Sequence, residues 1–216
     1  MGLELPPLDH DVSPLGYLLA PDTILWRVHT KGRVPGGFKP SALASGRFDC
    51  TDDDPYPSLY LAFDEPTALT EVLLRSVPFG RRGHRYLPYE TVRNRQISAV
   101  RTTRELRLVD LRSGRALAAA CQDEWLVHCE ERHFGHTRQW ASWLRERDPA
   151  ASGFVWWTRR NLSKASMVLF GDRPTFLEPA HLPTVELGTE GGLVQVNEWL
   201  RQFRASVAWP KEDPDW

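Results

Sequence analysis

The fold is decided by residues 58–73, which read Ser-Leu-Tyr-Leu-Ala-Phe-Asp-Glu-Pro-Thr-Ala-Leu-Thr-Glu-Val-Leu. The first six of these residues, Ser58 to Phe63, favour a strand. Asp64 can cap a helix, and the first turn of a helix tolerates Pro66. The buried stripe of that helix is predicted to consist of Ala68, Leu69, Val72 and Leu73. A strand that leads directly into a helix is therefore expected in the middle of the structure.

Upstream of this stretch, residues 24–29 read Ile-Leu-Trp-Arg-Val-His and predict another strand. A loop rich in glycine and proline joins the two strands. Residues 1–22 carry prolines among scattered leucines, a pattern that suits an extended arm lying over the domain better than a regular element. We expect regular structure to begin at Ile24.

Downstream, strand-like and helix-like segments follow one another. Strands are predicted at residues 97–101, 106–111, 153–158 and 166–170. Helices are predicted from residue 113 or 114 through Trp125, from Thr137 through Leu144, and over residues 196–203. Strands, then helices, then strands indicate a single α+β domain. We expect an N-terminal arm at 1–22, the catalytic domain at 23–206 and a loosely held tail at 207–216.

The charge balance excludes partners that are recognised through a long-range field. Lys and Arg number 27 against 28 for Asp and Glu, which gives a net charge of -1. Direct binding to nucleic acid or to an anionic membrane is therefore not expected. The sequence also lacks a long apolar run and the pattern of a signal peptide, so a cytoplasmic location is expected. The three cysteines, an odd count without repeated spacing, are interpreted as free structural thiols.

Two arginines are candidates for binding an anion. Arg27 interrupts an apolar strand, so its guanidinium either faces solvent or points into a cavity that requires a cation. Arg47 follows Gly46 directly, in a loop where both backbone and guanidinium could approach a phosphate closely. An ordinary turn explains the second pattern equally well.

Glu71 and Tyr60 are candidates for acting on a sugar or a ring. Glu71 lies at the border of the buried stripe, where a partly desolvated carboxylate can stabilise positive charge that develops on a ribose. The alternative is a surface glutamate paired with Arg75 four residues later. Tyr60 could stack on a flat ring, or it could be a strand tyrosine with a hydrated hydroxyl.

Several common kinds of site are not expected from the sequence. The cluster of histidines at residues 128–136 fits neither the spacing of a His-Glu-x-x-His helix nor that of paired cysteine ligands, so no metal site is predicted. The chain also lacks a Gly-x-Gly-x-x-Gly motif, a Walker loop and a Gly-x-Ser-x-Gly elbow.

Taken in order, seven short pieces of the chain resemble the RES family, which is named for an Arg, a Glu and a Ser. The resemblance covers about residues 24 to 173, and it rests on the joint order and spacing of the pieces. The pieces are Trp26-Arg27-Val28, Gly46-Arg47-Phe48-Asp49, Leu59-Tyr60-Leu61-Ala62, Thr67-Ala68-Leu69-Thr70-Glu71-Val72, His136-Thr137-Arg138-Gln139-Trp140-Ala141, Gly153-Phe154-Val155-Trp156-Trp157-Thr158-Arg159 and Met167-Val168-Leu169-Phe170.

The resemblance implies an ADP-ribosyltransferase-like fold, with two small mixed β-sheets, surrounding helices and a cleft for NAD. It implies that Arg27 and Arg47 grip the pyrophosphate, that Tyr60 lines the nicotinamide end and that Glu71 acts on the nicotinamide ribose. Thr158 occupies the place where the family usually has its serine. Threonine keeps a hydroxyl but is stiffer and bulkier, so the role is expected to survive with an altered orientation.

The resemblance also implies a biological role. RES proteins are toxins of toxin–antitoxin pairs that degrade NAD by phosphorolysis or hydrolysis, with NAD as substrate and no resident cofactor. The expected partner is an Xre-type helix-turn-helix antitoxin that inserts a segment into the cleft, and the exposed face it needs could also support a homodimer. Two alternatives stay open: a protein ADP-ribosyltransferase, and a binding module that is catalytically weak because Thr158 replaces the serine.

Overall fold

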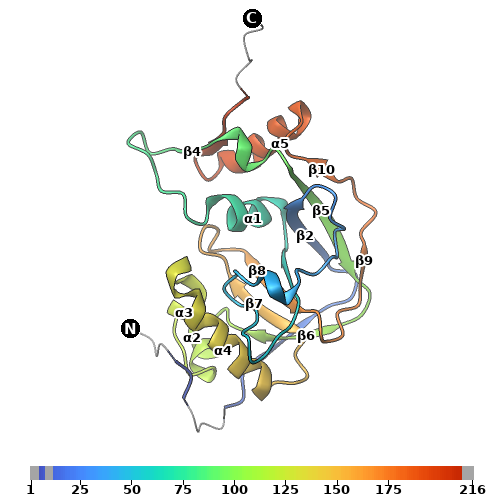
Figure 1. Ribbon diagram of the computed structural model, residues 1–216, viewed down its shortest axis with the longest axis vertical. Helices are drawn as coiled ribbons and strands as arrows, with labels where there is room; N and C mark the ends of the chain where they lie inside the picture. The colour runs from blue at the N-terminus through green and yellow to red at the C-terminus, as the bar shows by residue number, and fades with distance from the viewer. Residues whose placement is uncertain (1–4, 8–11, 211–216) are drawn as a thin grey trace, which may run out of the picture.

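A mixed sheet of nine strands forms the centre of the structure, a computed structural model that describes residues 5–7 and 12–210 (Figure 1). The strands pair in the order β1-β6-β7-β8-β3-β2-β5-β10, and β9 also pairs with β5. Their bounds are β1 Gly16–Leu19, β2 Ile24–Thr30, β3 Ser58–Ala62, β5 Arg95–Thr102, β6 Leu106–Asp110, β7 Gly153–Trp157, β8 Ala165–Phe170, β9 Leu177–Pro179 and β10 Val185–Glu186. Only β6 and β7 run parallel among the strand pairs described in this sheet.

Helices and a small second sheet complete the domain. The second sheet pairs β4 (Arg85–Leu87) with β11 (Ala205–Val207) in parallel. The helices are α1 Glu65–Leu69, α2 Gly114–Ala119, α3 Trp125–His128, α4 Phe134–Arg147 and α5 Glu190–Arg201, and a π-helical turn, Thr70–Leu74, continues α1. The predicted α+β single domain is thus confirmed. Within the described residues, no helix is both long enough and apolar enough to span a bilayer.

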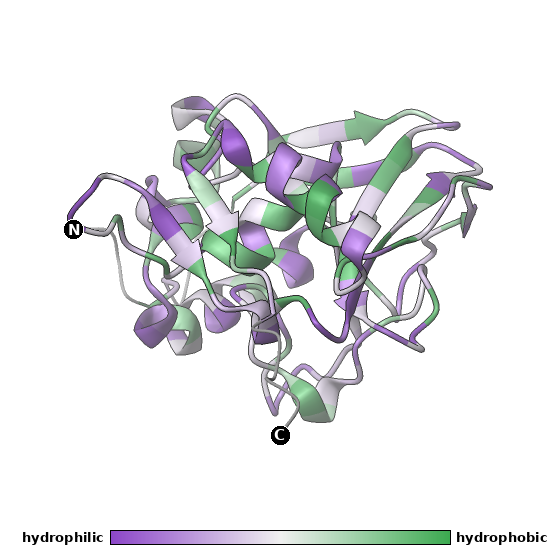
Figure 2. Cartoon of the chain, turned by 90° about the horizontal axis from the view of Figure 1, so that it is seen from above, coloured by the Kyte–Doolittle hydropathy of each residue, from purple (hydrophilic) through white to green (hydrophobic). Residues whose placement is uncertain are grey.

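The helices cover the two halves of the sheet separately. In Figure 1, α2, α3 and α4 lie beside β6, β7 and β8, while α1 and α5 lie beside β2 and β5. Each helical group has a buried core of its own, one centred on Trp140 and Trp156 and the other on Leu69 and Val196. A third core contains alternate residues of β3 and β8 and spans both halves on the other face. Figure 2 shows green hydrophobic segments on several of the strands and helices, next to purple hydrophilic ones.

The two halves of the sheet meet at a narrow seam. All seven residues of β2 pair with β5, but only Trp26 of β2 pairs with β3, opposite Ala62. A bridge between Lys39 and Ser58 closes the other end of β3. The resemblance implied two small sheets, whereas the structure joins both halves into one sheet through this single pair. Between the pair and the bridge, β2 and β3 separate and leave a slot.

The helix after β3 changes its pitch within the predicted buried stripe. The buried apolar residues are Ala68 and Leu69, followed five residues later by Leu73 and Leu74, and this five-residue spacing is that of a π-helix. Val72, predicted to be buried, is 40% exposed, so that part of the prediction is wrong. Asp64 caps α1 as predicted, because its carboxylate accepts a hydrogen bond from the Thr67 backbone N–H at 2.8 Å.

Other differences from the predicted elements have local causes. The segment expected as an irregular arm contains β1, which adds to the edge of the sheet by pairing with β6; residues 1–4 and 8–11 of the arm lie outside the described residues. The helix predicted to run through Trp125 is split into α2 and α3, because Cys121 has a φ of 55° that no helix accommodates. Helix α4 begins at Phe134, before the predicted Thr137.

The C-terminal tail and the shortest strands also depart from the predictions. Val207, expected as the first residue of the tail, ends β11, and the tail residues 211–216 lie outside the described residues. Strands β4, β9, β10 and β11 were not predicted from the sequence, because none is longer than three residues and so none carries a readable alternation.

Asp49 organises the loop that closes the slot. Its buried carboxylate accepts hydrogen bonds from the backbone N–H groups of Ser45 and Gly46 at 2.7 and 2.6 Å, and from the Ser58 hydroxyl at 2.7 Å. It also forms an ion pair with Lys39. Burial alone would raise the pKa of Asp49, but the Lys39 ammonium and these hydrogen bonds outweigh it and hold the pKa below its usual value.

We therefore expect Asp49→Asn to lower the free energy of unfolding by about 2–4 kcal/mol at pH 7, because an amide cannot satisfy the same four donors. The carboxylate stabilises the fold above its unfolded-state pKa of about 4, and this contribution is lost as the pH falls through the lower folded-state pKa. The difference in the free energy of unfolding between the natural chain and Asp49→Asn should become smaller below pH 4. Urea unfolding at several pH values measures this difference. Asp53→Asn, at an exposed aspartate of the same loop, is the control, and equal losses for both variants would contradict the account.

Candidate functional site

A cavity of about 690 Å³ occupies the slot between β2 and β3. Five consecutive residues of β2, Trp26 to Thr30, line it. Successive side chains of a strand point to opposite faces, so a strand paired on both edges could not offer all five to one cavity. The loss of pairing beyond Trp26 exposes the edge of β2 and makes this possible. The volume suits a ligand of the size of a large metabolite.

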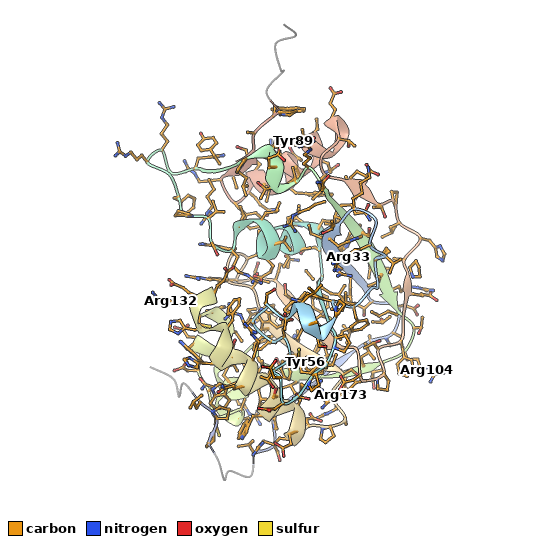
Figure 3. All side chains as sticks on the ribbon, in the orientation of Figure 1. Arg33, Tyr56, Tyr89, Arg104, Arg132 and Arg173 are labelled. Carbon is orange, nitrogen blue, oxygen red and sulfur yellow. The ribbon has the colours of Figure 1, made fainter. Side chains whose placement is uncertain are left out.

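The cavity carries an excess of positive charge. Five basic side chains line it against two acidic ones, and these are Arg27, Arg33, Lys39, Arg75, Arg95, Glu71 and Glu131. His29 also lines the cavity, and burial together with the charge of Arg27 lowers its pKa, which favours the neutral ring. Arg33 comes from the loop after β2 and is labelled beside that strand in Figure 3. Such a surface favours an anionic ligand.

Arg27 reaches the cavity from the free edge of β2. Its Nη1 donates to the carbonyl oxygens of Pro35, at 3.1 Å, and of Gly37, so the guanidinium also holds the loop that follows β2. Burial, with a smaller contribution from Arg33, lowers the pKa of Arg27 to about 10. The side chain stays protonated near neutral pH. Of the two alternatives predicted for Arg27, the structure therefore shows the side chain that points into a cavity and not the one that faces solvent.

Tyr60 and Glu71 both line the same cavity. The Tyr60 hydroxyl accepts a hydrogen bond from the Phe48 backbone N–H at 2.9 Å, and burial raises its pKa well above the usual value. Its ring lies 6.2 Å from that of Trp156, centroid to centroid. The Glu71 side chain is 18% exposed, and its Oε2 lies 3.9 Å from Arg75 Nη2. Both interpretations of Glu71 therefore hold together, because it is paired with Arg75 and lines the cavity.

Arg47 does not line the cavity. Its guanidinium is buried behind the wall, where Nη1 donates to Cys129 Sγ at 2.9 Å and Nη2 donates to the Cys129 carbonyl at 3.0 Å. Burial lowers the pKa of Arg47, and the neighbouring Cys129 partly offsets this by raising it. Arg27 and Glu71 thus line the same cavity, whereas Arg47 donates to the end of α3 from outside the lining, near enough for its charge to interact with those of Glu71 and Arg75. The neighbouring Gly46 does line the cavity, as close approach of the backbone requires.

Thr158 also lies outside the cavity lining. It is fully buried in the turn between β7 and β8, where its hydroxyl donates to the Asn161 carbonyl at 2.7 Å and accepts from the Asn161 N–H at 3.1 Å. Asn161 in turn donates through Nδ2 to the Thr67 hydroxyl at 3.0 Å. Thr158 therefore fastens a turn that holds α1, which precedes the π-helical turn carrying Glu71.

Sequence reasoning missed most of the polar residues of the cavity, and Arg75 and Ser166 are two of them. Arg75 lines the cavity four residues after Glu71. This spacing could have indicated its place there, but it was interpreted only as a pairing at the surface. Ser166 lines the cavity from β8, and its buried Oγ has no hydrogen-bond partner among the described residues. Ser166 alternates with the buried Val168 and Phe170, and a serine at the end of an apolar strand gives no sign of facing a cavity.

The arrangement can hold an anionic ligand that also carries a ring and a sugar. Arg27 from β2 and Arg75 from the end of the π-helical turn line one cavity, Tyr60 and Trp156 supply aromatic rings, and Glu71 is a partly buried carboxylate among them. In a site of low dielectric, that carboxylate can stabilise positive charge that develops on a bound sugar.

Comparison with known proteins gives two findings. The family model described as "RES domain" matches residues 24–189, which include every candidate site residue. Among solved structures, a chain in the crystal structure of the M. tuberculosis MbcT–MbcA toxin–antitoxin complex has a similar fold, with a TM-score of 0.53 and 15% sequence identity. That match covers 79% of the present chain and 86% of the other. None of the curated proteins matches the sequence.

The likeness in structure concerns the fold, since the identity is low. The family model decides membership, because it spans most of the domain and begins at Ile24, the first residue of β2. The chain therefore belongs to the RES domain family.

Proposed function

We propose that the chain is the toxin of a toxin–antitoxin pair and that it degrades NAD by cleaving the bond between nicotinamide and ribose. The observation that carries this proposal is the convergence of Arg27, Tyr60 and Glu71 on one cavity of about 690 Å³. The size and positive charge of the cavity suit a dinucleotide. Membership of the RES family and the fold shared with a chain of a toxin–antitoxin complex support the biological role.

The proposed chemistry requires few groups. The bond between C1′ of the ribose and the nicotinamide nitrogen breaks, and its electron pair leaves with nicotinamide, which departs as a neutral ring without a general acid. Glu71 stabilises the positive charge that develops on the ribose, while Arg27 neutralises the diphosphate and Tyr60 lines the nicotinamide end. An oxygen of phosphate or water then bonds to C1′. Phosphate gives ADP-ribose 1″-phosphate, and water gives ADP-ribose and releases a proton.

Thr158 enters this proposal as a residue of the scaffold. Its hydroxyl is engaged with both the N–H and the carbonyl of Asn161, and Thr158 is not among the residues that line the cavity. The substitution therefore gives no reason to expect a catalytically weak binding module.

The proposed partner is an antitoxin of the helix-turn-helix type that inserts a segment into the cavity. The similar solved structure is a toxin–antitoxin complex, and this supports an antitoxin as the partner of the present chain. The helix-turn-helix type rests on the resemblance to the family.

We expect the purified chain to consume NAD and Glu71→Gln to lower the rate at least about a hundredfold, because glutamine keeps the shape of the side chain but not its charge. Nicotinamide release, followed with and without phosphate, measures the rate and identifies the acceptor. Glu90→Gln, at an exposed glutamate paired with Arg93, is the matched control. Intact NAD in every sample would contradict the proposal and favour a binding module. Slow NAD loss with a labelled protein band would favour a protein ADP-ribosyltransferase.

A second prediction concerns the turn. Thr158→Ser should keep the rate of NAD cleavage within about twofold, because serine supplies the same hydroxyl. Thr158→Val should lower the free energy of unfolding by about 1–3 kcal/mol, because it leaves the buried Asn161 N–H without its acceptor. Thermal unfolding and nicotinamide release measure the two effects. A stable Thr158→Val protein that has lost its activity would instead indicate that the hydroxyl contacts the substrate.

A further inference from the structure

We propose that Arg75 is the second guanidinium that binds the diphosphate of the dinucleotide, in the role that the resemblance to the RES family implies for Arg47. The inference rests on the proposed function and specifies how the same cavity recognises its ligand. It begins from a disagreement between the sequence and the structure, because Arg47 lies behind the cavity wall while Arg75 lines the cavity.

Arg75 is held in place from two directions. Arg160, from the turn between β7 and β8, donates to the carbonyl oxygens of Leu74 and Arg75 at 3.1 and 3.0 Å, and so caps the end of the π-helical turn. The Arg75 guanidinium carbon lies 5.4 Å from the centroid of the Phe134 ring, within the range of a cation–π contact. A guanidinium ordered in this way loses little freedom when it binds a ligand.

The hydrogen-bonding capacity of Arg75 is largely unused by the residues around it. Its two carboxylate neighbours, Glu71 and Glu131, each lie 3.9 Å from the nearest guanidinium nitrogen, whereas charge-assisted hydrogen bonds are about 2.7–2.9 Å long. The Glu131 side chain is 60% exposed, so water and salt weaken its attraction. A diphosphate oxygen can therefore displace Glu131 and bind the guanidinium at full strength.

Two other cations near the cavity already have partners within the protein. Lys39 forms an ion pair with the buried Asp49, and the donors of Arg47 are taken by α3. Arg95 pairs with Thr30, at the opposite end of β2 from the Trp26–Ala62 pair. Arg33 follows that same end of β2, in the next loop. Arg27, in the middle of β2, and Arg75, the residue after the π-helical turn, face the same cavity.

The experiment is isothermal titration of the full chain with ADP-ribose, inorganic pyrophosphate and adenosine at constant ionic strength in a buffer without phosphate. Arg75→Met keeps the apolar stem against Phe134 and removes the charge, and Glu131→Gln removes the competing carboxylate. Arg93→Met, at an exposed arginine outside the cavity lining, is the matched control. Thermal unfolding verifies that each variant is folded.

We expect Arg75→Met to weaken binding of ADP-ribose and of pyrophosphate about tenfold or more and to leave adenosine binding unchanged. Glu131→Gln should bind both anions at least as tightly as the natural chain. Anion affinities of Arg75→Met within about twofold of the natural chain, or a natural chain that binds neither anion, would overturn the assignment. A natural chain that binds pyrophosphate but neither ADP-ribose nor adenosine would contradict the dinucleotide function, and the pyrophosphate titrations would still decide the role of Arg75.

Discussion

The site depends on a ladder of backbone hydrogen bonds that stops after one residue pair. Because β3 pairs with β2 only at Trp26 and Ala62, the remaining edge of β2 is open, and both of its faces contribute side chains to one cavity. Hydrogen bonds to the loop between β2 and β3 stabilise this gap. Asp49 accepts hydrogen bonds from the loop and from β3, and Arg27 donates to the loop carbonyls of Pro35 and Gly37. The seam between the half-sheets is thus where the domain forms its cavity.

The charged groups around the slot have separate roles that burial and pairing assign to them. Asp49 and Arg47 have their hydrogen bonds satisfied within the protein, and they shape the loop and hold the end of α3. Arg27, Glu71 and Arg75 line the cavity. The Glu71 Oε2 atom lies 3.9 Å from Arg75 Nη2. A neutral leaving group requires no strong acid, so a cavity with cations, an aromatic wall and one carboxylate is sufficient for the proposed cleavage.

The sequence predicted the parts of the fold that have a strong local signal. The alternation in residues 58–63 and the cap at Asp64 identify β3 and α1, and Arg27 and Glu71 stand out because each is a charge within an apolar pattern. The orientation of Arg47 and Thr158 could not be predicted, because each depends on partners distant in sequence or on a turn geometry. A pattern built on α-helical periodicity cannot reveal the π-helical turn, so Val72 was wrongly predicted to be buried. The pairing of Arg75 with Glu71 is observed, but its place in the cavity lining was not predicted.

The most direct test of the account is a crystal structure of the Glu71→Gln variant with NAD. The account predicts the dinucleotide in the slot between β2 and β3, with the nicotinamide ribose beside residue 71 and the diphosphate between Arg27 and Arg75. A dinucleotide bound elsewhere on the surface, or side chains 27 and 71 directed to separate faces of the protein, would contradict it.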